Sequence, residues 1–318
     1  MRNERVAMSR TAPRRYVIGV DLGGTKIRAG VLAGSGQLLA RSEGPTPADD
    51  GELLLQELAL IIDKVTSDAG IHSVEEIAAT AVGAAGVLDH DTGALTFAPN
   101  LSGLDGIPFR SALEQRLGHP VHIVNDVNAA ALGELYYGAG RDASSFAFIG
   151  IGTGVGMGLV IDGKVVTGSH GAAGEIGHLP LGGDPLDPAN HRSGPLENTV
   201  SGPAVERRYA ASTGRALSAR EIYDAIPHDQ VARDLVTEQA RDLALAVCAI
   251  TAVVDPEVLV LGGGVGSRPE LAQGVREWLQ RLGADSTRVV VSTAGDWGPV
   301  LGAAHAALDC QNRHGEGR

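Results

Sequence analysis

The sequence predicts an α/β protein built from two similar domains that face a cleft. One observation is that β-rich runs alternate, from Tyr16 onward, with segments whose apolar residues recur at helical spacing. The other is an internal repeat, VIGVDLGGTKIRAGVL and later FIGIGTGVGMGLVI, in which a buried strand, a glycine turn and a second strand follow one another. A chain of 318 residues is long enough for two such domains.

The first half of the chain carries the elements of one domain. Its β-rich runs predict strands at 16–21, 26–33, 38–44, 77–86 and 120–126. Its helix-periodic segments predict helices at 52–70, 109–118 and 127–138. This alternation is typical of an α/β domain.

The same pattern then starts again in the second half. FAFIGIGTGVGMGLVIDGKVV (146–166) predicts three strands, joined first by a glycine turn and then by the tight turn DG. After it we expect a helix near 233–253, a strand at 257–263, a helix near 269–282, a strand at 288–292 and a last helix near 298–308.

Composition and charge exclude several classes of protein. The formal net charge of −12 and the 11 aromatic residues argue against a nucleic-acid partner. Cys248 and Cys310 form no C-x-x-C pair, so neither a disulfide framework nor a redox motif is expected. No apolar run is long enough to span a bilayer, and the opening MRNERVAMSRTAPRR has no apolar core of a signal peptide. We therefore expect a disordered tail at 1–15 and a cytoplasmic protein without a membrane partner.

Two glycine turns occupy equivalent places in the repeat. The first contains Gly23, Gly24 and Thr25 before Lys26, and the second contains Gly152, Thr153 and Gly154. Glycines let backbone N–H groups approach an anion closely, and a hydroxyl adds a donor. One such turn would usually be a simple hairpin, but the pair favours a phosphate clamp. Neither is a Walker or a Rossmann loop, because a strand rather than a helix follows each turn.

Two further features extend this nucleotide site. Asp21 ends the first strand, where its carboxylate could meet a phosphate-bound Mg²⁺ through water. LGGGVG (261–266) is a third glycine turn, between a strand and a helix. Its residues Gly262, Gly263 and Gly264 could take the nucleoside end of a ligand, or could serve only to pack the helix.

These segments together resemble the ROK family of bacterial sugar kinases, repressors and relatives, within the actin-like ATPase superfamily. DLGGTK, GIGTGVGMGLV, VDPEVLVLGGGV and GPVLGAAHAAL resemble its phosphate, adenosine and closing-helix segments, and APNL, NDVNAAALGE and GEIGH its sugar-site segments. The resemblance implies two actin-like (ribonuclease H-like) domains, each a mixed sheet with helices, flanking an interdomain cleft. It implies a smaller domain at 16–126, joined by the C-terminal helix 298–310, and a larger one at 127–297.

Family repressors carry an N-terminal helix-turn-helix. The 15 residues before Tyr16 are too few for such a unit. The resemblance therefore favours an ATP- and Mg²⁺-dependent kinase, with a homodimer as the expected assembly. It implies that Asp126 accepts the proton of the sugar 6-hydroxyl. From the residues alone, Asp126 could equally cap a helix starting at Val127.

The family's sugar contacts map onto Asn100, Asn125, Asp126, Glu175, His178 and Glu197, and all six residue types are present. Amide side chains both donate and accept, which suits neighbouring sugar hydroxyls. Taken alone, Asn100 in PNLSG would be interpreted as a turn residue.

One family feature is missing. The family pattern here is a histidine followed by C-x-C-G-x-x-G-C-x-E, in which the histidine and three cysteines hold Zn²⁺. Alignment on GPLE places Pro188, Asn190 and Pro195 at the cysteine positions. We expect no structural zinc, a loop ordered by packing or by bound sugar, and a sugar-binding role alone for His178.

The substrate is left open by this departure, because some polyphosphate-using glucokinases and amino-sugar kinases, such as kanosamine kinase, also lack the cysteines. The first hypothesis is a kinase for the 6-hydroxyl of glucose or a close relative, including an amino-glucose such as kanosamine. The second moves the substrate to N-acetylmannosamine, N-acetylglucosamine, mannose or fructose. The third is a non-catalytic sugar sensor, which the phosphate clamp and the base at Asp126 argue against.

Overall fold

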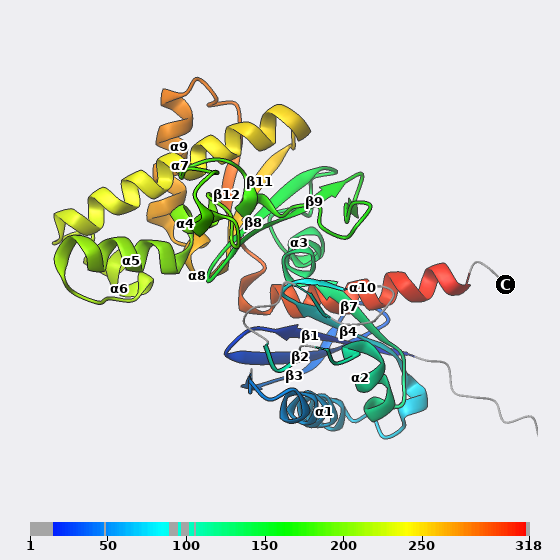
Figure 1. Cartoon of the computed structure of the whole chain (residues 1–318). Coiled ribbons are helices and arrows are strands. Elements are labelled where there is room, and N and C mark those ends of the chain that lie inside the picture. Colours follow the sequence, from blue (N-terminus) through cyan, green and yellow to red (C-terminus); the bar gives the residue numbers. More distant parts are fainter. Residues whose placement is uncertain (1–14, 48, 89–94, 97–101, 105, 316–318) are drawn as a thin grey trace, which may run out of the picture. The chain divides into compact units, whose positions relative to one another are not determined.

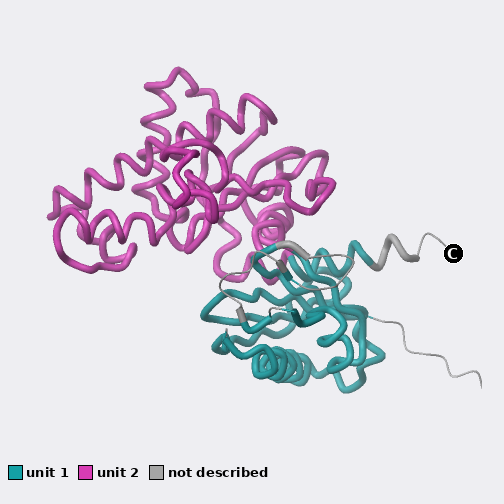
Figure 2. Tube along the Cα trace, in the orientation of Figure 1, with its two compact units in different colours: residues 1–124, 303–318 teal, residues 125–302 magenta. Residues whose placement is uncertain are grey.

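The computed structural model of the chain divides into two compact units, coloured separately in Figure 2. One comprises residues 1–124 and 303–318, and the other residues 125–302. The structure describes residues 15–47, 49–88, 95–96, 102–104 and 106–315. Asn100 and the expected disordered tail, except for its last residue, therefore lie outside the described residues. Each unit contains a five-stranded sheet with helices, which confirms the predicted fold class.

The sheet of the first unit has the strand order β3-β2-β1-β4-β7. Its strands are β1 (Tyr16–Leu22), β2 (Lys26–Ala33), β3 (Leu38–Pro45), β4 (Ile77–Ala84) and β7 (Val121–Asn125). β1, β2 and β3 pair antiparallel, whereas β1 and β4 are parallel. A separate hairpin pairs β5 (Val87–Leu88) with β6 (Leu95–Thr96).

Two helices complete the core of the first unit, α1 (Gly51–Asp68) and α2 (Phe109–Leu117). α1 buries Leu54 and Leu58 against alternate residues of β1, among them Ile18 and Val20. Because successive strand residues point to opposite faces, this spacing places one face of the sheet under the helices. The short 3₁₀ helices of this unit are η1 (Val74–Glu76) and η2 (Ser102–Leu104).

The sheet of the second unit repeats the strand order of the first, as β10-β9-β8-β11-β12, and the first four strands in this order pair in the same directions as their counterparts. Its strands are β8 (Phe146–Ile151), β9 (Val155–Ile161), β10 (Lys164–Val165), β11 (Val258–Gly262) and β12 (Val289–Val291). β8, β9 and β10 pair antiparallel, and β11 is parallel to both β8 and β12. The two glycine turns thus join corresponding strands, β1 to β2 and β8 to β9, as the internal repeat predicts.

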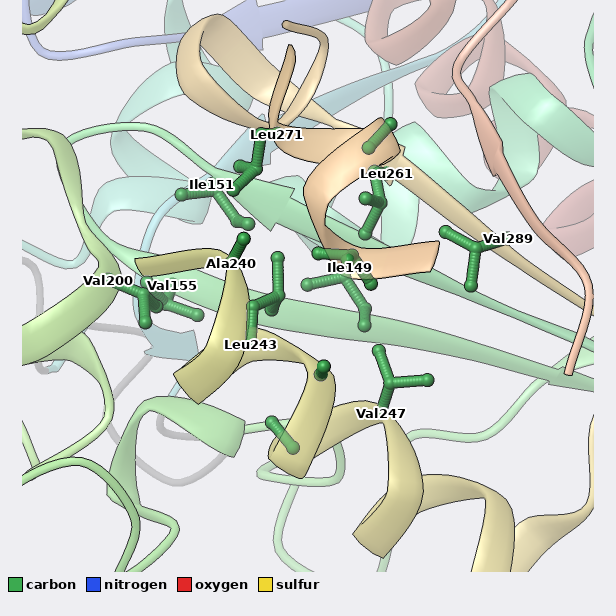
Figure 3. Packing of buried hydrophobic residues seen from close by; sticks show 14 of the residues in the cluster. Ile149, Ile151, Val155, Val200, Ala240, Leu243, Val247, Leu261, Leu271 and Val289 are labelled. Atoms are coloured by element: carbon green, nitrogen blue, oxygen red, sulfur yellow. The ribbon is translucent and has the colours of Figure 1, made fainter. Parts of the chain in front are cut away.

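Helices cover both faces of the second sheet. On one face, Ile149 and Ile151 pack with Leu243 of α7 (Gln230–Val254) and Leu271 of α9 (Pro269–Arg281), as Figure 3 shows. On the other, Phe146 and its neighbours pack against α3 (Asp126–Tyr137). The sheet therefore holds α3, and with it Asp126, in a fixed position relative to the second glycine turn.

The rest of the second unit consists of shorter elements around this sheet (Figure 1). They are η3 (Ile176–His178), η4 (Pro188–Asn190), α4 (Glu197–Val200), α5 (Gly202–Thr213), α6 (Ala219–Ala225), α8 (Gly263–Gly266) and η5 (Gly295–Trp297). The last helix, α10 (Gly298–Gly315), runs beyond the predicted end at 308. Within the described residues, no helix has the length and apolar character needed to cross a membrane.

Candidate active site

Asn125 and Asp126 lie where β7 ends and α3 begins. The side-chain Oδ1 of Asn125 accepts hydrogen bonds from the backbone N–H groups of Val127 and Asn128, each at 3.1 Å. Asn125 is therefore the N-cap, and Asp126 is the first residue of the helix. The alternative role for Asp126, as the cap of a helix starting at Val127, is wrong, so its carboxylate is not needed to cap α3.

The environment of Asp126 makes it a stronger base than an ordinary aspartate. Burial raises the pKa of its carboxyl, while hydrogen bonds from the backbone N–H groups of Val127 and of Asp126 itself act in the opposite direction. The Val127 N–H donates to its Oδ1 at 2.8 Å. A raised pKa moves a carboxylate toward the range in which a general base works best near neutral pH.

Three further predicted sugar-site residues lie in the same unit as Asp126, and their electrostatic interactions converge on Glu175. The pKa of Glu175 is raised, chiefly by burial of its carboxylate and then by the negative charges of Asp126 and Glu197. The charge of His178 lowers this pKa and partly offsets the rise. Glu175 directly precedes the 3₁₀ helix η3, His178 is the last residue of that helix, and both are exposed as whole residues. The structure thus brings four of the six predicted sugar residues, Asp126, Glu175, His178 and Glu197, into one electrostatic cluster, with Asn125 adjacent in the chain.

Glu197, the first residue of α4, is tied to the strand that follows the second glycine turn. Its Oε2 accepts a hydrogen bond from the backbone N–H of Val155 at 2.8 Å. Burial raises the pKa of Glu197, and the hydrogen bonds from Val155 and Ser193, together with the charge of His178, partly offset this. Because Val155 directly follows Gly154, the position of this carboxylate depends on the conformation of the glycine turn.

Glycines allow the close approaches that assemble this cluster. A Cβ on Gly194, whose φ is +88°, would lie 2.1 Å from the carbonyl oxygen of Gly177. A Cβ on Gly177 would in turn lie 3.2 Å from the Cβ of Glu197. η3, with His178, therefore packs backbone to backbone against the segment that leads into Glu197.

A substitution in the second glycine turn should disturb Glu197 selectively. A Cβ on Gly154 would lie 2.9 Å from Oε2 of Glu197, whereas a Cβ on Gly152 would have no atom within 4 Å. We expect Gly154→Ala to displace the carboxylate and to weaken sugar binding about tenfold, which is the effect of losing one hydrogen bond to a charged group. Calorimetric titration with sugar in the absence of nucleotide measures this.

Gly152→Ala is the matched control for that prediction, because it adds the same methyl group to the same turn. It should leave sugar binding without nucleotide within about twofold of the wild type, less than one hydrogen bond of ordinary strength. Equal losses in the two variants would contradict a specific contact between Gly154 and Glu197.

The first glycine turn lies in the other unit. Gly23 N–H donates to the Lys26 carbonyl oxygen at 3.0 Å, and the Thr46 hydroxyl donates to the Gly23 carbonyl oxygen at 2.7 Å. Gly24, Thr25 and Lys26 are exposed, and the Lys26 ammonium pairs with Glu43 at 3.2 Å. The turn is thus closed by its own hydrogen bonds, with its tip open to a ligand.

Asp21 precedes this turn and is the predicted magnesium contact. Its Oδ2 lies 3.7 Å from the guanidinium of Arg28. Mg²⁺ in nucleotide sites usually takes one or two carboxylates together with phosphate oxygens and water. Asp21 fits such a site as a single, partly exposed carboxylate at the end of β1.

The third glycine turn joins β11 to α8. A Cβ on Gly262 would lie 2.4 Å from the ring of Phe148, and one on Gly263, at φ +82°, would lie 2.5 Å from the carbonyl oxygen of Ile151. Packing therefore accounts for these two glycines. Gly264 is exposed and has no atom within 4 Å of the Cβ position, so it remains open to a ligand.

The zinc site of the family pattern does not fit this chain. Pro188 and Pro195 offer no side-chain ligand, and both amide atoms of Asn190 already bond to protein groups. Among the described residues, no group of three or more histidine, cysteine, aspartate or glutamate side chains is placed to hold a metal ion. The absence of structural zinc stays a prediction for metal analysis.

Sequence analysis did not identify several residues that build the cluster. Ser193, Gly177 and Gly194 are visible in EIGHLP and SGPLE, and glycine beside a functional residue is a usable signal of close backbone approach. The N–H of Val155 left no signal, since any residue except proline supplies one.

Comparison with known proteins identifies the family to which this fold belongs. A model of the ROK family matches residues 17–309, and the chain belongs to that family. A beta-glucoside kinase from Listeria monocytogenes is 30% identical, over 94% of this chain and 99% of its own length.

Solved structures agree with this assignment. A ROK hexokinase from Thermus thermophilus superimposes with a TM-score of 0.79 at 34% identity, covering 93% of this chain and 99% of that chain. A ROK family glucokinase from Streptomyces griseus, solved with glucose and AMPPNP, superimposes with a TM-score of 0.77 at 29% identity, covering 92% and 99%.

Proposed function

We propose that the protein is an ATP- and Mg²⁺-dependent hexose kinase that phosphorylates the 6-hydroxyl of glucose or of a close relative, including an amino-glucose such as kanosamine. The observation that carries the proposal is Asp126, a carboxylate of raised pKa that interacts electrostatically with Glu175, which in turn interacts with His178 and Glu197. The ROK hexokinase and the glucokinase that binds glucose and AMPPNP support the same class of reaction.

In this proposal Asp126 accepts the proton of the 6-hydroxyl as that oxygen bonds to the γ-phosphorus and the bond between phosphorus and the ADP oxygen breaks. Glu175, His178 and Glu197, with Asn125 and Asn100, bind the other hydroxyls. Charged and amide groups of this kind fix a sugar's orientation through directional hydrogen bonds. Holding the hydroxyl in line is a large part of the rate enhancement.

The phosphates are assigned to the two glycine turns, with Lys26 and Thr153 as side-chain donors, and the nucleoside end to Gly264 and its neighbours. Mg²⁺, when bound, neutralises charge on the phosphates, and Asp21 would hold it through water. Arg28, 3.7 Å from Asp21, limits the charge that this carboxylate alone presents. The homodimer and the cytoplasmic location implied by sequence analysis remain predictions.

Coupled turnover with Mg-ATP across a sugar panel tests the proposal. The panel contains glucose, kanosamine, glucosamine, mannose, fructose, N-acetylmannosamine and N-acetylglucosamine. We add a β-glucoside because a relative is named a beta-glucoside kinase. We expect the highest kcat/KM on glucose or an amino-glucose; a preference for an N-acetyl sugar would move the substrate to the second hypothesis.

The same panel decides between a kinase and a sensor. A sugar that binds without turnover, with either ATP or polyphosphate as donor, would contradict the kinase assignment and favour a sugar sensor. Glucose 6-phosphate, identified as the product by a glucose-6-phosphate dehydrogenase couple, would establish both the acceptor and the position of transfer.

A further inference from the structure

The segment that aligns with the cysteines of the family pattern, residues 188–195, is held by a group of hydrogen bonds around Asn190. Its Nδ2 donates to the carbonyl oxygen of Asp184 at 2.7 Å, and its Oδ1 accepts from Nδ2 of Asn198 at 2.9 Å. Asn198 Nδ2 also donates to the carbonyl oxygen of Ala189 at 3.1 Å. Asn190 is partly buried, although the residues just before it are exposed.

These bonds join a surface loop to the helix that carries a predicted sugar ligand. Asn198 is the second residue of α4, directly after Glu197. Its backbone N–H donates to the carbonyl oxygen of Gly194 at 3.1 Å, and its carbonyl oxygen accepts from Nη2 of Arg207 at 3.2 Å. The start of α4 is thus fixed by the loop on one side and by α5 on the other.

The other end of α4 is fixed independently. The carbonyl oxygen of Val200 accepts from Nε2 of the fully buried Gln239 at 2.6 Å, and the Gln239 Oε1 accepts from the Tyr223 hydroxyl at 2.6 Å. The end of α4 therefore has its own anchor in the core. Loss of the hydrogen bonds made by the Asn198 side chain would therefore loosen only the start of α4, where Glu197 lies.

We propose that Asn190 and Asn198 form a polar clasp that positions Glu197 for sugar binding, in place of the zinc that the family pattern would supply. The clasp is defined as the hydrogen bonds of these two side chains with each other and with the carbonyl oxygens of Asp184 and Ala189. Asn190 and Asn198 are positioning residues, since they act through Glu197. The inference rests on the proposed sugar site.

Two substitutions of the same chemistry separate the role of the clasp from a general effect of mutation. Asn198→Asp replaces the donor that links α4 to the loop, so that a carboxylate oxygen faces Oδ1 of Asn190 and the carbonyl oxygen of Ala189. Asn190→Asp keeps the acceptor for Asn198 and loses only the bond to Asp184. Both variants add one negative charge to the same region.

We expect Asn198→Asp to raise the KM for the sugar about tenfold, with kcat and the KM for ATP within about twofold, since the loss of one or two hydrogen bonds corresponds to that range. Asn190→Asp should raise the sugar KM less than threefold. Leu186→Ala, which removes an 82% exposed side chain of the same loop, should have no effect.

Hydrogen exchange gives a readout that does not require activity or an identified sugar. While the clasp holds Glu197 in place, its carboxylate accepts the N–H of Val155 and protects it from exchange. Exchange at this amide should therefore rise about tenfold in Asn198→Asp and not in Leu186→Ala. Unchanged exchange at Val155 in Asn198→Asp would overturn the inference, as would an equal rise in the sugar KM of both aspartate variants. Stoichiometric zinc in the purified wild type would overturn it too.

Failure of the proposed function gives a different result. A wild type that phosphorylates none of the sugars would refute the kinase proposal, while the exchange of the Val155 amide would still decide whether the clasp holds Glu197. If Asn198→Asp does not fold, Asn198→Ser, which keeps one donor on a shorter side chain, replaces it with the same expected direction at Val155.

Discussion

Replacing Asp126 with asparagine is expected to lower kcat by about 10²- to 10⁴-fold while the sugar still binds, because a general base contributes an effect of that size. Asparagine keeps the Oδ1 that accepts from the Val127 N–H, and Asn125 still caps the helix. The start of α3 should therefore be unchanged. Steady-state kinetics with the best sugar, together with calorimetric binding of that sugar, measure both parts of the prediction.

The same substitution should stabilise the protein at neutral pH. Burial raises the pKa of Asp126 above the unfolded value of about 3.9, so the charged carboxylate costs stability once the pH exceeds the folded pKa. Below the unfolded pKa both states are protonated and this cost disappears. The Tm of Asp126→Asn should exceed that of the wild type at pH 8, and the difference should shrink as the pH falls toward 4.

Asp142→Asn is the control, since it removes an exposed carboxylate of the same unit. It should leave kcat and the Tm at pH 8 close to those of the wild type. A kcat of Asp126→Asn near that of the wild type would assign the base to another residue. A lower Tm for Asp126→Asn at pH 8 would show that the charge of Asp126 stabilises the fold.

The duplicated architecture could be predicted because its signals are local. Each sheet starts with a hairpin whose strands are rich in apolar residues and whose turn is rich in glycine, and the long helices α1, α7 and α9 show helical spacing over several turns. Such periodicity depends on nearby residues only. The strand order, in contrast, became evident only from the pairing of β1 with β4 and of β8 with β11.

The segment from 197 to 225 was assigned no elements from the sequence, although it holds α4, α5 and α6. α4 has four residues and α6 has seven, too few for a helical period to be recognised. One signal was present: Ser218 and Glu221 form a capping box at the start of α6.

The candidate site could be predicted in its residue types but not in its connections. The resemblance assigned Glu175, His178 and Glu197 to one site, and their electrostatic contacts agree with that grouping. The hydrogen bond between Glu197 and Val155 joins residues 42 positions apart, and no local sequence pattern predicts it. Asn190 aligns with a cysteine of the family pattern, and its structural role became evident only from its hydrogen bonds in the structure.

Replacing Gly174 with alanine is expected to cause one of the largest losses of stability in the second unit. A Cβ at this position, where φ is +94°, would lie 1.8 Å from the carbonyl oxygen of Met157. The Gly174 carbonyl oxygen accepts from the Met157 N–H at 2.8 Å, so relief of the overlap would break this link between the η3 segment and β9. Overpacking of about 1–3 kcal/mol and left-handed strain of about 1–2 kcal/mol act together here.

Gly163→Ala separates these two costs, because Gly163 also has a positive φ, +69°, but has no atom within 4 Å of the Cβ position. Gly163→Ala should reduce the free energy of unfolding only by the left-handed strain, about 1–2 kcal/mol, whereas Gly174→Ala should reduce it by at least about twice as much. Thermal denaturation of both variants measures this. Because Gly174 directly precedes Glu175, its alanine variant should also bind sugar more weakly, and Gly163→Ala should not. Equal losses of stability would mean that the strand and the η3 segment can separate at little cost, and that Glu175 is positioned by other contacts.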